Sequence, residues 1–419
     1  MDKILIRGGG TLKGTIPISG AKNATLPALA ATLLTSDRVY LSNIPHLVDV
    51  TTMLELLGRH GAALTIDEKL GVEIDNKGID NFCAPYDLVR TMRASILVMG
   101  PMLAHYGQAE ISLPGGCAIG SRPVNLHIQG LRALGADISL GNGFIRARCK
   151  RLSGARIYLE PVTVTGTENL LMAATLADGI TTLENAAREP EVVDLANMLI
   201  SMGAKIRGAG SSTIIIEGVK ELHGTSHTII PDRIETVTFI IAAAITNGEV
   251  TLTNTQSEFL TVPLEKLRQA GVIIEEEGGN SLKVRSNGNL QAVDFQTSPY
   301  PGFPTDIQAQ MLVFNSMAAG SSIVTETIFE NRFMHVSELQ RMGANIQIHG
   351  NSVHVQGMGK LVGAPVMATD LRASASLVLA GLAAEGETLI SRVYHLDRGY
   401  ERIEEKLLAL GAEIKRLSE

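Results

Sequence analysis

The sequence predicts an α/β protein of two domains, each built from three copies of one supersecondary repeat. A short signature, glycine followed by alanine or valine after a helical pattern, recurs about every 70 residues along the 419-residue chain. An Ala/Leu-rich helical pattern lies about 25 residues before each signature. The signature glycines are Gly61, Gly135, Gly203, Gly271, Gly343 and Gly411. Six copies of a helix-and-strand pattern therefore establish the fold class.

Each repeat is expected to run strand-helix-strand-helix-strand-strand. Its first helix, as in LLMAATLADGITTLEN or FIIAAAITNGEVTLTN, is apolar on almost every side, which is typical of a buried helix. The second helix ends at the signature glycine, which suits a left-handed C-cap. Two alternating segments follow, as in ANIQIHGNSVHVQG, and they predict a pair of strands with one buried face.

The two ends of the chain indicate how the repeats are grouped. The sixth repeat stops at AEIKRLSE and lacks one strand, whereas the N-terminal segments KILIRG and GTIPIS supply one strand more than the first repeat needs. We therefore expect the N-terminus to complete the sixth repeat. The predicted domains are residues 22–229 and, discontinuously, 1–21 with 230–419. A ligand site is expected in the cleft between two such domains.

Composition and motifs exclude several classes of function. A net charge of −7 argues against a nucleic-acid-binding protein. The chain has no signal-peptide pattern and no run of about 18 apolar residues, so we expect a cytoplasmic protein without a membrane partner. Three unpaired-looking cysteines, scattered histidines and the lack of P-loop and dinucleotide fingerprints predict no metal and no cofactor. No feature of the sequence predicts an oligomeric state.

The segment PGGCAIGSR interrupts the repeat pattern. In the second repeat the distance from the first helix to the signature glycine is longer by several residues than in the others, and this segment contains the surplus. Cys117, between Gly116 and Ala118, does not fit a standard core position, and nearby arginines would tune its thiol as a general acid or nucleophile. Cys83 and Cys149 are expected to be inert. We also expect residues 113–123 to act as a lid.

Positive charges recur where helices begin. Arginines start the second helix in four repeats, and basic residues also start three of the first helices, although the helix dipole disfavours a cation there. A bound anion explains both groups, since helix N-termini and arginines together bind oxyanions. The ordinary alternative is a surface ion pair, which we favour for Arg188. The residues are Arg122, Arg188, Arg332 and Arg398 for the second helices, and Lys22, Arg93 and Arg372 for the first.

Several motifs together resemble one family across the whole chain. GAKNATLPALAATLL, RTMRAS, LPGGCAIGSRP, PTDIQAQ, ENRF and DLRASASLVLAGL are similar to the UDP-N-acetylglucosamine 1-carboxyvinyltransferases, which are enolpyruvyl transferases. The resemblance implies two inside-out α/β domains of three repeats each. It also implies transfer of enolpyruvate from phosphoenolpyruvate to the 3′-hydroxyl of UDP-N-acetylglucosamine, with release of phosphate, at the opening step of peptidoglycan synthesis.

The resemblance also implies roles for individual residues. Cys117 would protonate the phosphoenolpyruvate methylene and could form a covalent thioketal adduct with that substrate, and Asp306 would be the general base. Lys22 and Arg398 would act in catalysis while holding phosphoenolpyruvate. The expected phosphoenolpyruvate set is Lys22, Asn23, Arg122, Arg332, Arg372 and Arg398. The expected nucleotide-sugar set is Asn23, Arg93, Arg122, Pro123, Val124, Asn125, Leu126, Val162, Thr163, Val164, Thr165, Asp306 and Ile328.

The chain departs from the family pattern at three single positions and in the segment TGTEN near Thr165. Asn125 stands where many members have aspartate, Pro161 where some have lysine, and Val48 where others have a cleft lysine. These departures concern contacts to the nucleotide and leave the reaction unchanged. Two alternatives remain open at this point: the sister transferase that acts on shikimate 3-phosphate, and a six-repeat ring clamp without chemistry.

Overall fold

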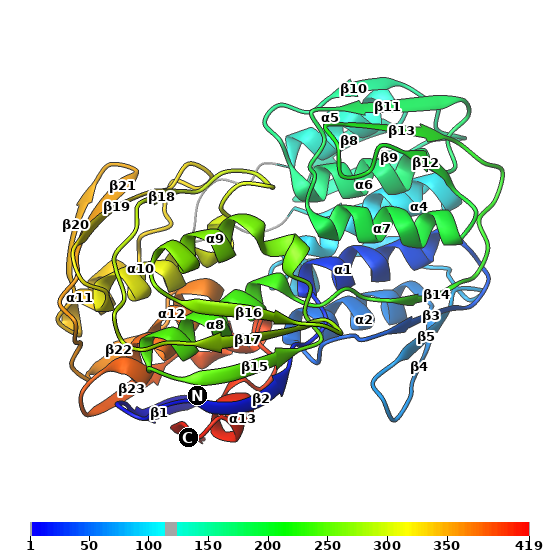
Figure 1. Cartoon of the computed structure of the whole chain (residues 1–419). Helices are drawn as coiled ribbons and strands as arrows, with labels where there is room; N and C mark the ends of the chain where they lie inside the picture. Colours follow the sequence, from blue (N-terminus) through cyan, green and yellow to red (C-terminus); the bar gives the residue numbers. More distant parts are fainter. Residues whose placement is uncertain (1, 114–123, 419) are drawn as a thin grey trace. The chain divides into compact units, whose positions relative to one another are not determined.

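The computed structural model describes residues 2–113 and 124–418 (Figure 1). The described chain forms two compact lobes. The C-terminal lobe consists of residues 2–19 and 231–418, and the N-terminal lobe of residues 20–113 and 124–230. Each lobe has its own hydrophobic core. Within the described residues, no helix is long and apolar enough to cross a membrane.

Each lobe contains three four-stranded sheets, one for each repeat. In the N-terminal lobe, the strand order of the first sheet is β14 (Ser226–Thr228), β3 (Val39–Ser42), β5 (Val72–Asp75) and β4 (Ala63–Ile66). That of the second sheet is β6 (Cys83–Ala84), β7 (Gln108–Ser112), β9 (Phe144–Arg148) and β8 (Asp137–Gly141). That of the third sheet is β10 (Arg156–Tyr158), β11 (Ile180–Glu184), β13 (Thr213–Glu217) and β12 (Lys205–Arg207). In the C-terminal lobe, the strand order of the first sheet is β2 (Lys13–Pro17), β15 (Glu249–Thr253), β17 (Ser281–Arg285) and β16 (Ile273–Glu277). That of the second sheet is β18 (Phe295–Gln296), β19 (Ser321–Thr325), β21 (Ser352–Gln356) and β20 (Asn345–His349). That of the third sheet is β22 (Pro365–Met367), β23 (Glu387–Ser391), β1 (Lys3–Arg7) and β24 (Glu413–Leu417).

The first helix of each repeat is buried and the second lies nearer the surface. The buried helices are α1 (Lys22–Ala31), α4 (Met99–Tyr106), α6 (Val164–Ala174), α8 (Arg233–Ile245), α10 (Gln308–Met317) and α12 (Leu371–Ala383). The second helices are α2 (Val48–His60), α5 (Asn125–Ala133), α7 (Pro190–Ser201), α9 (Thr261–Gln269), α11 (Val336–Arg341) and α13 (Ile403–Ala409). Shorter helical turns are α3 (Tyr86–Val89), η1 (Thr32–Leu34), η2 (Arg93–Val98), η3 (Ser257–Leu260), η4 (Thr305–Ile307) and η5 (Val393–Arg398).

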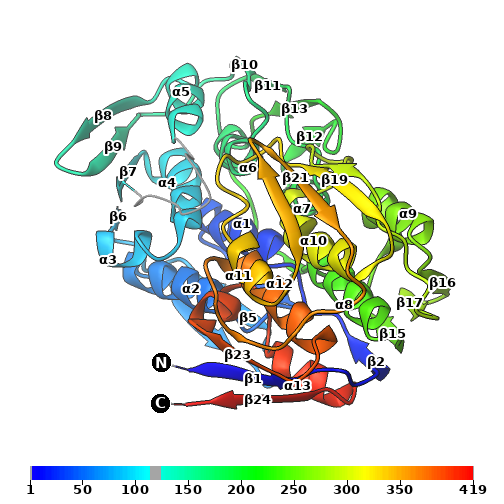
Figure 2. The same cartoon turned by 90° about the vertical axis from the view of Figure 1, so that its left-hand side faces the viewer.

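The burial pattern explains the inside-out arrangement, in which the helices lie inside each lobe and the sheets lie outside. All thirteen residues of α8 are buried, as its uniformly apolar sequence predicts. The strands around it alternate, so each sheet packs one face on the helices and turns the other to solvent; β15 has the pattern of a half-exposed strand. Within the C-terminal lobe, β15 to β17 lie along α8 in Figure 1, and β19 and β21 lie along α10 in Figure 2. The predicted fold class is confirmed.

The signature glycines and the N-terminal strand behave as expected. All six glycines have a φ angle between +91° and +110°, the left-handed conformation that ends a helix without steric cost. β1 pairs antiparallel with both β23 and β24, so the N-terminus does complete the sixth sheet.

In the first and fourth repeats, the strand that precedes the first helix joins the sheet of the other repeat. β2, which directly precedes α1, pairs in parallel with β15 of the fourth repeat, with Ile16 opposite Leu252. β14, which directly precedes α8, pairs in parallel with β3 of the first repeat. The first and fourth repeats have therefore exchanged their leading strands. A period-two pattern predicts a strand but not which sheet it joins, so the sequence did not reveal the exchange.

Candidate active site

A carboxylate held between two arginines dominates the chemistry of the C-terminal lobe. Asp306 lies on η4, and its Oδ1 accepts a hydrogen bond of 3.0 Å from Arg332 while its Oδ2 accepts one of 3.0 Å from Arg372. The two arginine side chains are 4% and 5% exposed, whereas that of Asp306 is 26% exposed. The carboxylate is therefore fixed by buried cations and still reached by solvent.

The local sequence orients Arg372 toward this carboxylate. Asp370 is the N-cap of α12, and its Oδ1 accepts hydrogen bonds from the backbone nitrogens of Arg372 and Ala373 at 3.0 and 3.1 Å. Burial works against the charge of Arg372, but the charge of Asp306 together with the interactions with Tyr400 and Asp232 outweighs it and raises the pKa of the guanidinium. Arg372 is thus permanently charged at the start of a buried helix.

A polar network lies behind the pair formed by Arg372 and Asp306. The guanidinium carbon of Arg372 lies 5.5 Å from the ring centroid of Tyr400. Gln310 Nε2 donates to the Tyr400 hydroxyl at 3.0 Å and to the backbone oxygen of Asp306 at 3.1 Å, and the Tyr400 hydroxyl also lies 2.9 Å from Thr238 Oγ1. Burial raises the pKa of Tyr400, so its hydroxyl stays neutral. The network fixes the site before any ligand binds.

One donor of Arg372 is not used within the described part of the chain. Its Nη1 atom is buried and has no hydrogen-bond partner among the described residues. A buried donor without an acceptor costs roughly 1–3 kcal/mol, because it has lost its hydrogen bonds to water. An anionic ligand that accepted this hydrogen bond would recover that cost. The site is therefore suited to a carboxylate or a phosphate.

In the N-terminal lobe, Lys22 forms a second polar cluster. It occupies the first position of α1, and its Nζ lies 3.4 Å from Asp49 Oδ2 in the first turn of α2. Both side chains are largely buried. The carboxylate offsets the unfavourable placement of a cation at a helix N-terminus. Asn23 follows Lys22 on the same helix.

A buried histidine contacts the predicted nucleotide-sugar segment through one of its ring nitrogens. His127 on α5 has its pKa lowered to about 4, first by burial and then by the charge of Arg93. Its Nδ1 accepts from Asn169 Nδ2 at 2.9 Å, because the Asn169 Oδ1 already accepts from the Gly100 backbone nitrogen. The His127 Nε2 therefore carries the proton and faces Thr165 Oγ1 at 3.4 Å. A neutral histidine thus connects α5 to the start of α6.

The structure describes most of the predicted site residues, some in each lobe. It brings together Asp306, Arg332 and Arg372, as reported above. The C-terminal lobe also contains Ile328 and Arg398, the last residue of η5. The N-terminal lobe contains Lys22, Asn23, Arg93, Val124, Asn125, Leu126, Val162, Thr163, Val164 and Thr165. Cys117, Arg122 and Pro123 lie outside the described residues, as does most of the predicted lid.

Sequence reasoning missed the supporting residues. Gln310 and Tyr400 in one lobe, and His127 and Asn169 in the other, were not predicted to have a role. The available signal was a polar side chain inside an otherwise apolar helix: Gln310 and Asn169 are both fully buried on α10 and α6. No group of three or more histidine, cysteine, aspartate or glutamate side chains that could hold a metal occurs in the described part of the chain.

A buried glutamate is expected to make the stability of the N-terminal lobe depend on pH. Glu168 on α6 is 1% exposed, and its Oε1 has no hydrogen-bond partner among residues 2–113 and 124–418. Burial raises its pKa well above the ordinary value, and the charges of Glu191 and Glu189 at the start of α7 add to the shift. The folded chain therefore keeps a proton on Glu168 that the unfolded chain releases.

The Glu168→Gln variant is expected to lose part of this pH dependence. Wild-type stability should fall as pH rises above about 4.5, by at most about 1.4 kcal/mol per pH unit, because only the unfolded state releases the proton. The neutral glutamine removes that term, so urea midpoints at pH 5 and pH 9 should differ less in the variant than in the wild type. Glu221→Gln, at an exposed position of the same lobe, is the control. Equal pH slopes for Glu168→Gln and the wild type would contradict the expectation.

Comparison with known proteins identifies the family. The family model described as EPSP synthase (3-phosphoshikimate 1-carboxyvinyltransferase) matches residues 6–407. The chain belongs to the enolpyruvyl transferase family. Two curated relatives named UDP-N-acetylglucosamine 1-carboxyvinyltransferase, from Magnetococcus marinus and Halorhodospira halophila, are 69% and 59% identical to this enolpyruvyl transferase, each over 100% of both chains.

Solved structures agree with this enolpyruvyl transferase fold. The crystal structure of the enolpyruvyl transferase NikO from Streptomyces tendae has a TM-score of 0.90 at 26% identity, covering 100% of this chain and 99% of that one. An EPSP synthase structure from Acinetobacter baumannii has a TM-score of 0.78 at 18% identity over both whole chains, which supports the fold alone.

Proposed function

We propose that this enolpyruvyl transferase moves enolpyruvate from phosphoenolpyruvate to the 3′-hydroxyl of UDP-N-acetylglucosamine and releases phosphate. The names of the two full-length relatives support this choice of substrates. The observation that carries the chemistry is Asp306, a solvent-reached carboxylate held by two buried arginines, one of which has an unused donor. Its place would be the opening step of peptidoglycan synthesis, in the cytoplasm, where this nucleotide sugar would be the acceptor.

The reaction requires an acid and a base in turn. A proton added to the methylene carbon of phosphoenolpyruvate turns it into a methyl group and leaves positive charge on C2. The sugar 3′-oxygen attacks C2 and loses its proton to a base. The methyl group then returns a proton, the bond from C2 to the phosphate oxygen breaks, and phosphate leaves with the bonding electrons. The chain must therefore supply one donor, one acceptor and enough positive charge to hold the phosphate.

We assign these roles to residues of both lobes. Cys117 is the donor and the residue that forms the thioketal adduct. Asp306 is the acceptor, because the ion pairs with Arg332 and Arg372 hold and orient its carboxylate. Lys22, Asn23, Arg122, Arg332, Arg372 and Arg398 hold phosphoenolpyruvate, and the unused Nη1 of Arg372 is the donor that the structure offers to its anionic groups.

The nucleotide-sugar contacts are assigned with the same reasoning. The start of α6 is a favourable place for a diphosphate because of the backbone N–H groups that the Thr163 cap does not use; that cap accepts only from the Gly166 nitrogen, at 3.2 Å. The proposed set is Asn23, Arg93, Arg122, Pro123, Val124, Asn125, Leu126, Val162, Thr163, Val164, Thr165, Asp306 and Ile328. We propose that the two lobes act as the two domains of the enzyme, each contributing one part of this set.

A phosphate-release assay tests the proposal directly. Purified protein mixed with phosphoenolpyruvate and UDP-N-acetylglucosamine should release phosphate stoichiometrically with the enolpyruvyl product. Replacing the nucleotide sugar by shikimate 3-phosphate should reduce the release to background. Activity with shikimate 3-phosphate instead would assign the sister reaction, and binding of either substrate without turnover would favour a clamp without chemistry.

A further inference from the structure

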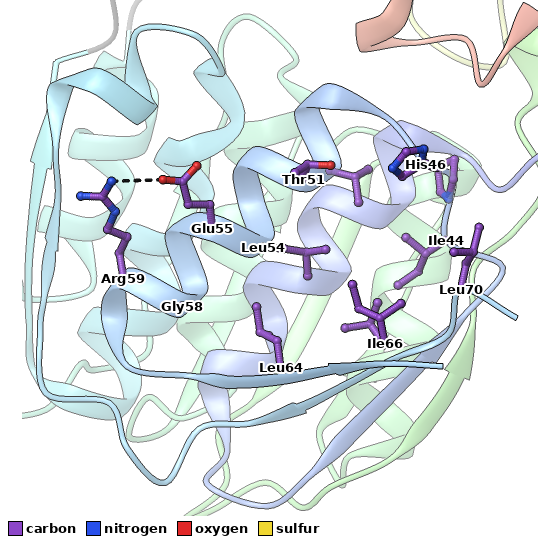
Figure 3. Close-up of a pocket in the computed structure, with 13 residues that line it drawn as sticks. Ile44, His46, Thr51, Leu54, Glu55, Gly58, Arg59, Leu64, Ile66 and Leu70 are labelled. Carbon is purple, nitrogen blue, oxygen red and sulfur yellow. Dashed lines mark hydrogen bonds and ion pairs between the residues drawn. The ribbon is translucent and has the colours of Figure 1, made fainter. Parts of the chain in front are cut away.

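An apolar groove of about 740 Å³ lies on the first repeat, between α2 and the hairpin of β4 and β5. Ile44, Leu54, Leu64 and Ile66 project into it in Figure 3. The ion pair between Glu55 and Arg59, with an N–O distance of 3.1 Å, lies toward one end, and His46 lies toward the other. The volume and the mostly apolar lining are typical of sites for small molecules.

The other five repeats have a large side chain at the helix position that faces this groove in the first repeat. The position three residues before each signature glycine lies on the second helix, and in five repeats it has a large side chain: Arg132, Ile200, Arg268, Gln340 and Leu408. Arg132 and Gln340 reach over the neighbouring edge strand and donate to the backbone oxygens of Ile138 and Ile346, both at 2.7 Å. Arg268 makes the same contact with Ile274 at 3.4 Å. In these three repeats a side-chain N–H donor thus links the second helix to the backbone of the neighbouring strand.

The first repeat has a glycine at this position. Gly58 precedes Leu64 by six residues, the same interval that separates Arg132 from Ile138. A Cβ atom added to Gly58 would meet only Leu64 Cδ1, at 3.9 Å, and the backbone there is helical, so neither crowding nor strain requires glycine. As a result Leu64 is only partly buried, whereas the equivalent isoleucines of the other five repeats are 2–9% exposed.

Glycine inside a helix is unfavourable, second only to proline. Its presence where a side chain would fit indicates that the space above Leu64 is kept open. We propose that this groove binds a small molecule with an apolar body and an N–H donor group, such as an alkyl guanidine or amine. The apolar body takes the place of the missing side-chain stem. The donor group faces the backbone oxygen of Leu64, which corresponds to the acceptor used in the second, fourth and fifth repeats. Glu55, which also pairs with Arg59, is the acidic residue among those that line the groove.

The groove is distinct from the residues assigned to the reaction. Val50, Leu54 and Gly58 recur every four residues along one face of α2, and this face lines the groove. Asp49 and Met53 lie on the buried face of the same helix, where Asp49 contacts Lys22. A side chain introduced at Gly58 therefore enters the groove and leaves the proposed site residues in place.

Calorimetric titration with hexylguanidinium tests the proposal. The wild type should bind one equivalent, and Gly58→Arg, which supplies the side chain found in the second and fourth repeats, should weaken binding by at least about tenfold. Gly58→Leu is a second blocking variant, chosen because Leu408 occupies the same position in the sixth repeat. Both variants should release phosphate at the wild-type rate, which would show that they are folded. Arg268→Gly, a matched change in the fourth repeat, should leave the wild-type binding event unchanged.

Three results would overturn the proposal. The first is no binding by the wild type at millimolar probe, and the second is equal binding by the wild type and Gly58→Arg. The third is self-association of the wild type in sedimentation experiments that Gly58→Arg abolishes, because the groove would then be an interface between two copies of the chain. None of these results depends on which acceptor substrate the enzyme uses.

Discussion

Asp306→Asn is expected to lower turnover by about 10²- to 10⁴-fold, the usual effect of removing a general base. Asparagine keeps the size of the side chain but cannot accept the proton of the sugar hydroxyl. Its amide oxygen can still accept from one arginine, while its NH2 group faces the other. Because Arg332 and Arg372 are both buried, this mismatch should also lower the free energy of unfolding by about 1–3 kcal/mol.

Phosphate release and urea unfolding measure the two effects separately. The exposed Asp80→Asn change in the N-terminal lobe is the control and should alter neither. A folded Asp306→Asn variant that retained more than about a tenth of wild-type turnover would rule out Asp306 as the base. A variant with lost turnover and unchanged stability would mean that the two arginines find other partners.

Cys117→Ser is expected to reduce phosphate release by about 10²- to 10⁴-fold, because a serine hydroxyl is too weak an acid to protonate phosphoenolpyruvate. Cys117→Asp should remain active, since a carboxylic acid can supply the proton. It should also resist thiol-alkylating epoxides, which should inactivate the wild type. Undiminished turnover by Cys117→Ser, or inactivity of a folded Cys117→Asp, would contradict the role of proton donor.

The other two cysteines provide a matched control. Burial raises the pKa of the Cys83 thiol and of the Cys149 thiol, so both are weak nucleophiles at neutral pH. Cys83→Ser and Cys149→Ser should keep full turnover and remain sensitive to epoxides. Loss of epoxide sensitivity in either variant would show that the modified thiol is not Cys117.

The repeat signature carried most of the information about the fold. A glycine at each helix end and a uniformly apolar helix upstream determine local structure, so six repeats could be predicted without any tertiary information. The exchange of β2 and β14 could not, because an alternating pattern predicts a strand but not the sheet that it joins.

Of the candidate site, too, one part could be predicted from the sequence and another part could not. Cations at helix starts, such as Lys22 and Arg372, were recognisable because the helix dipole makes them locally unfavourable. The side chains that contact those cations could not be predicted from the sequence in this way. The network of Gln310 and Tyr400 joins α10 to a segment 90 residues away, and no spacing rule links them. Polar contacts between distant elements depend on packing geometry, which one sequence does not encode in a local pattern.

The exchanged strands also set an order in which the lobes can be completed during synthesis. All the strands of the N-terminal lobe lie between residues 39 and 228, so this lobe can close once that stretch has left the ribosome. β1 and β2, although made first, must wait for β24 and β15, their partners in the C-terminal lobe. Until then the side chains of Ile4, Ile6 and Ile16, which are buried in the folded chain, have no sheet to join, and this apolar N-terminal segment stays exposed to non-native association.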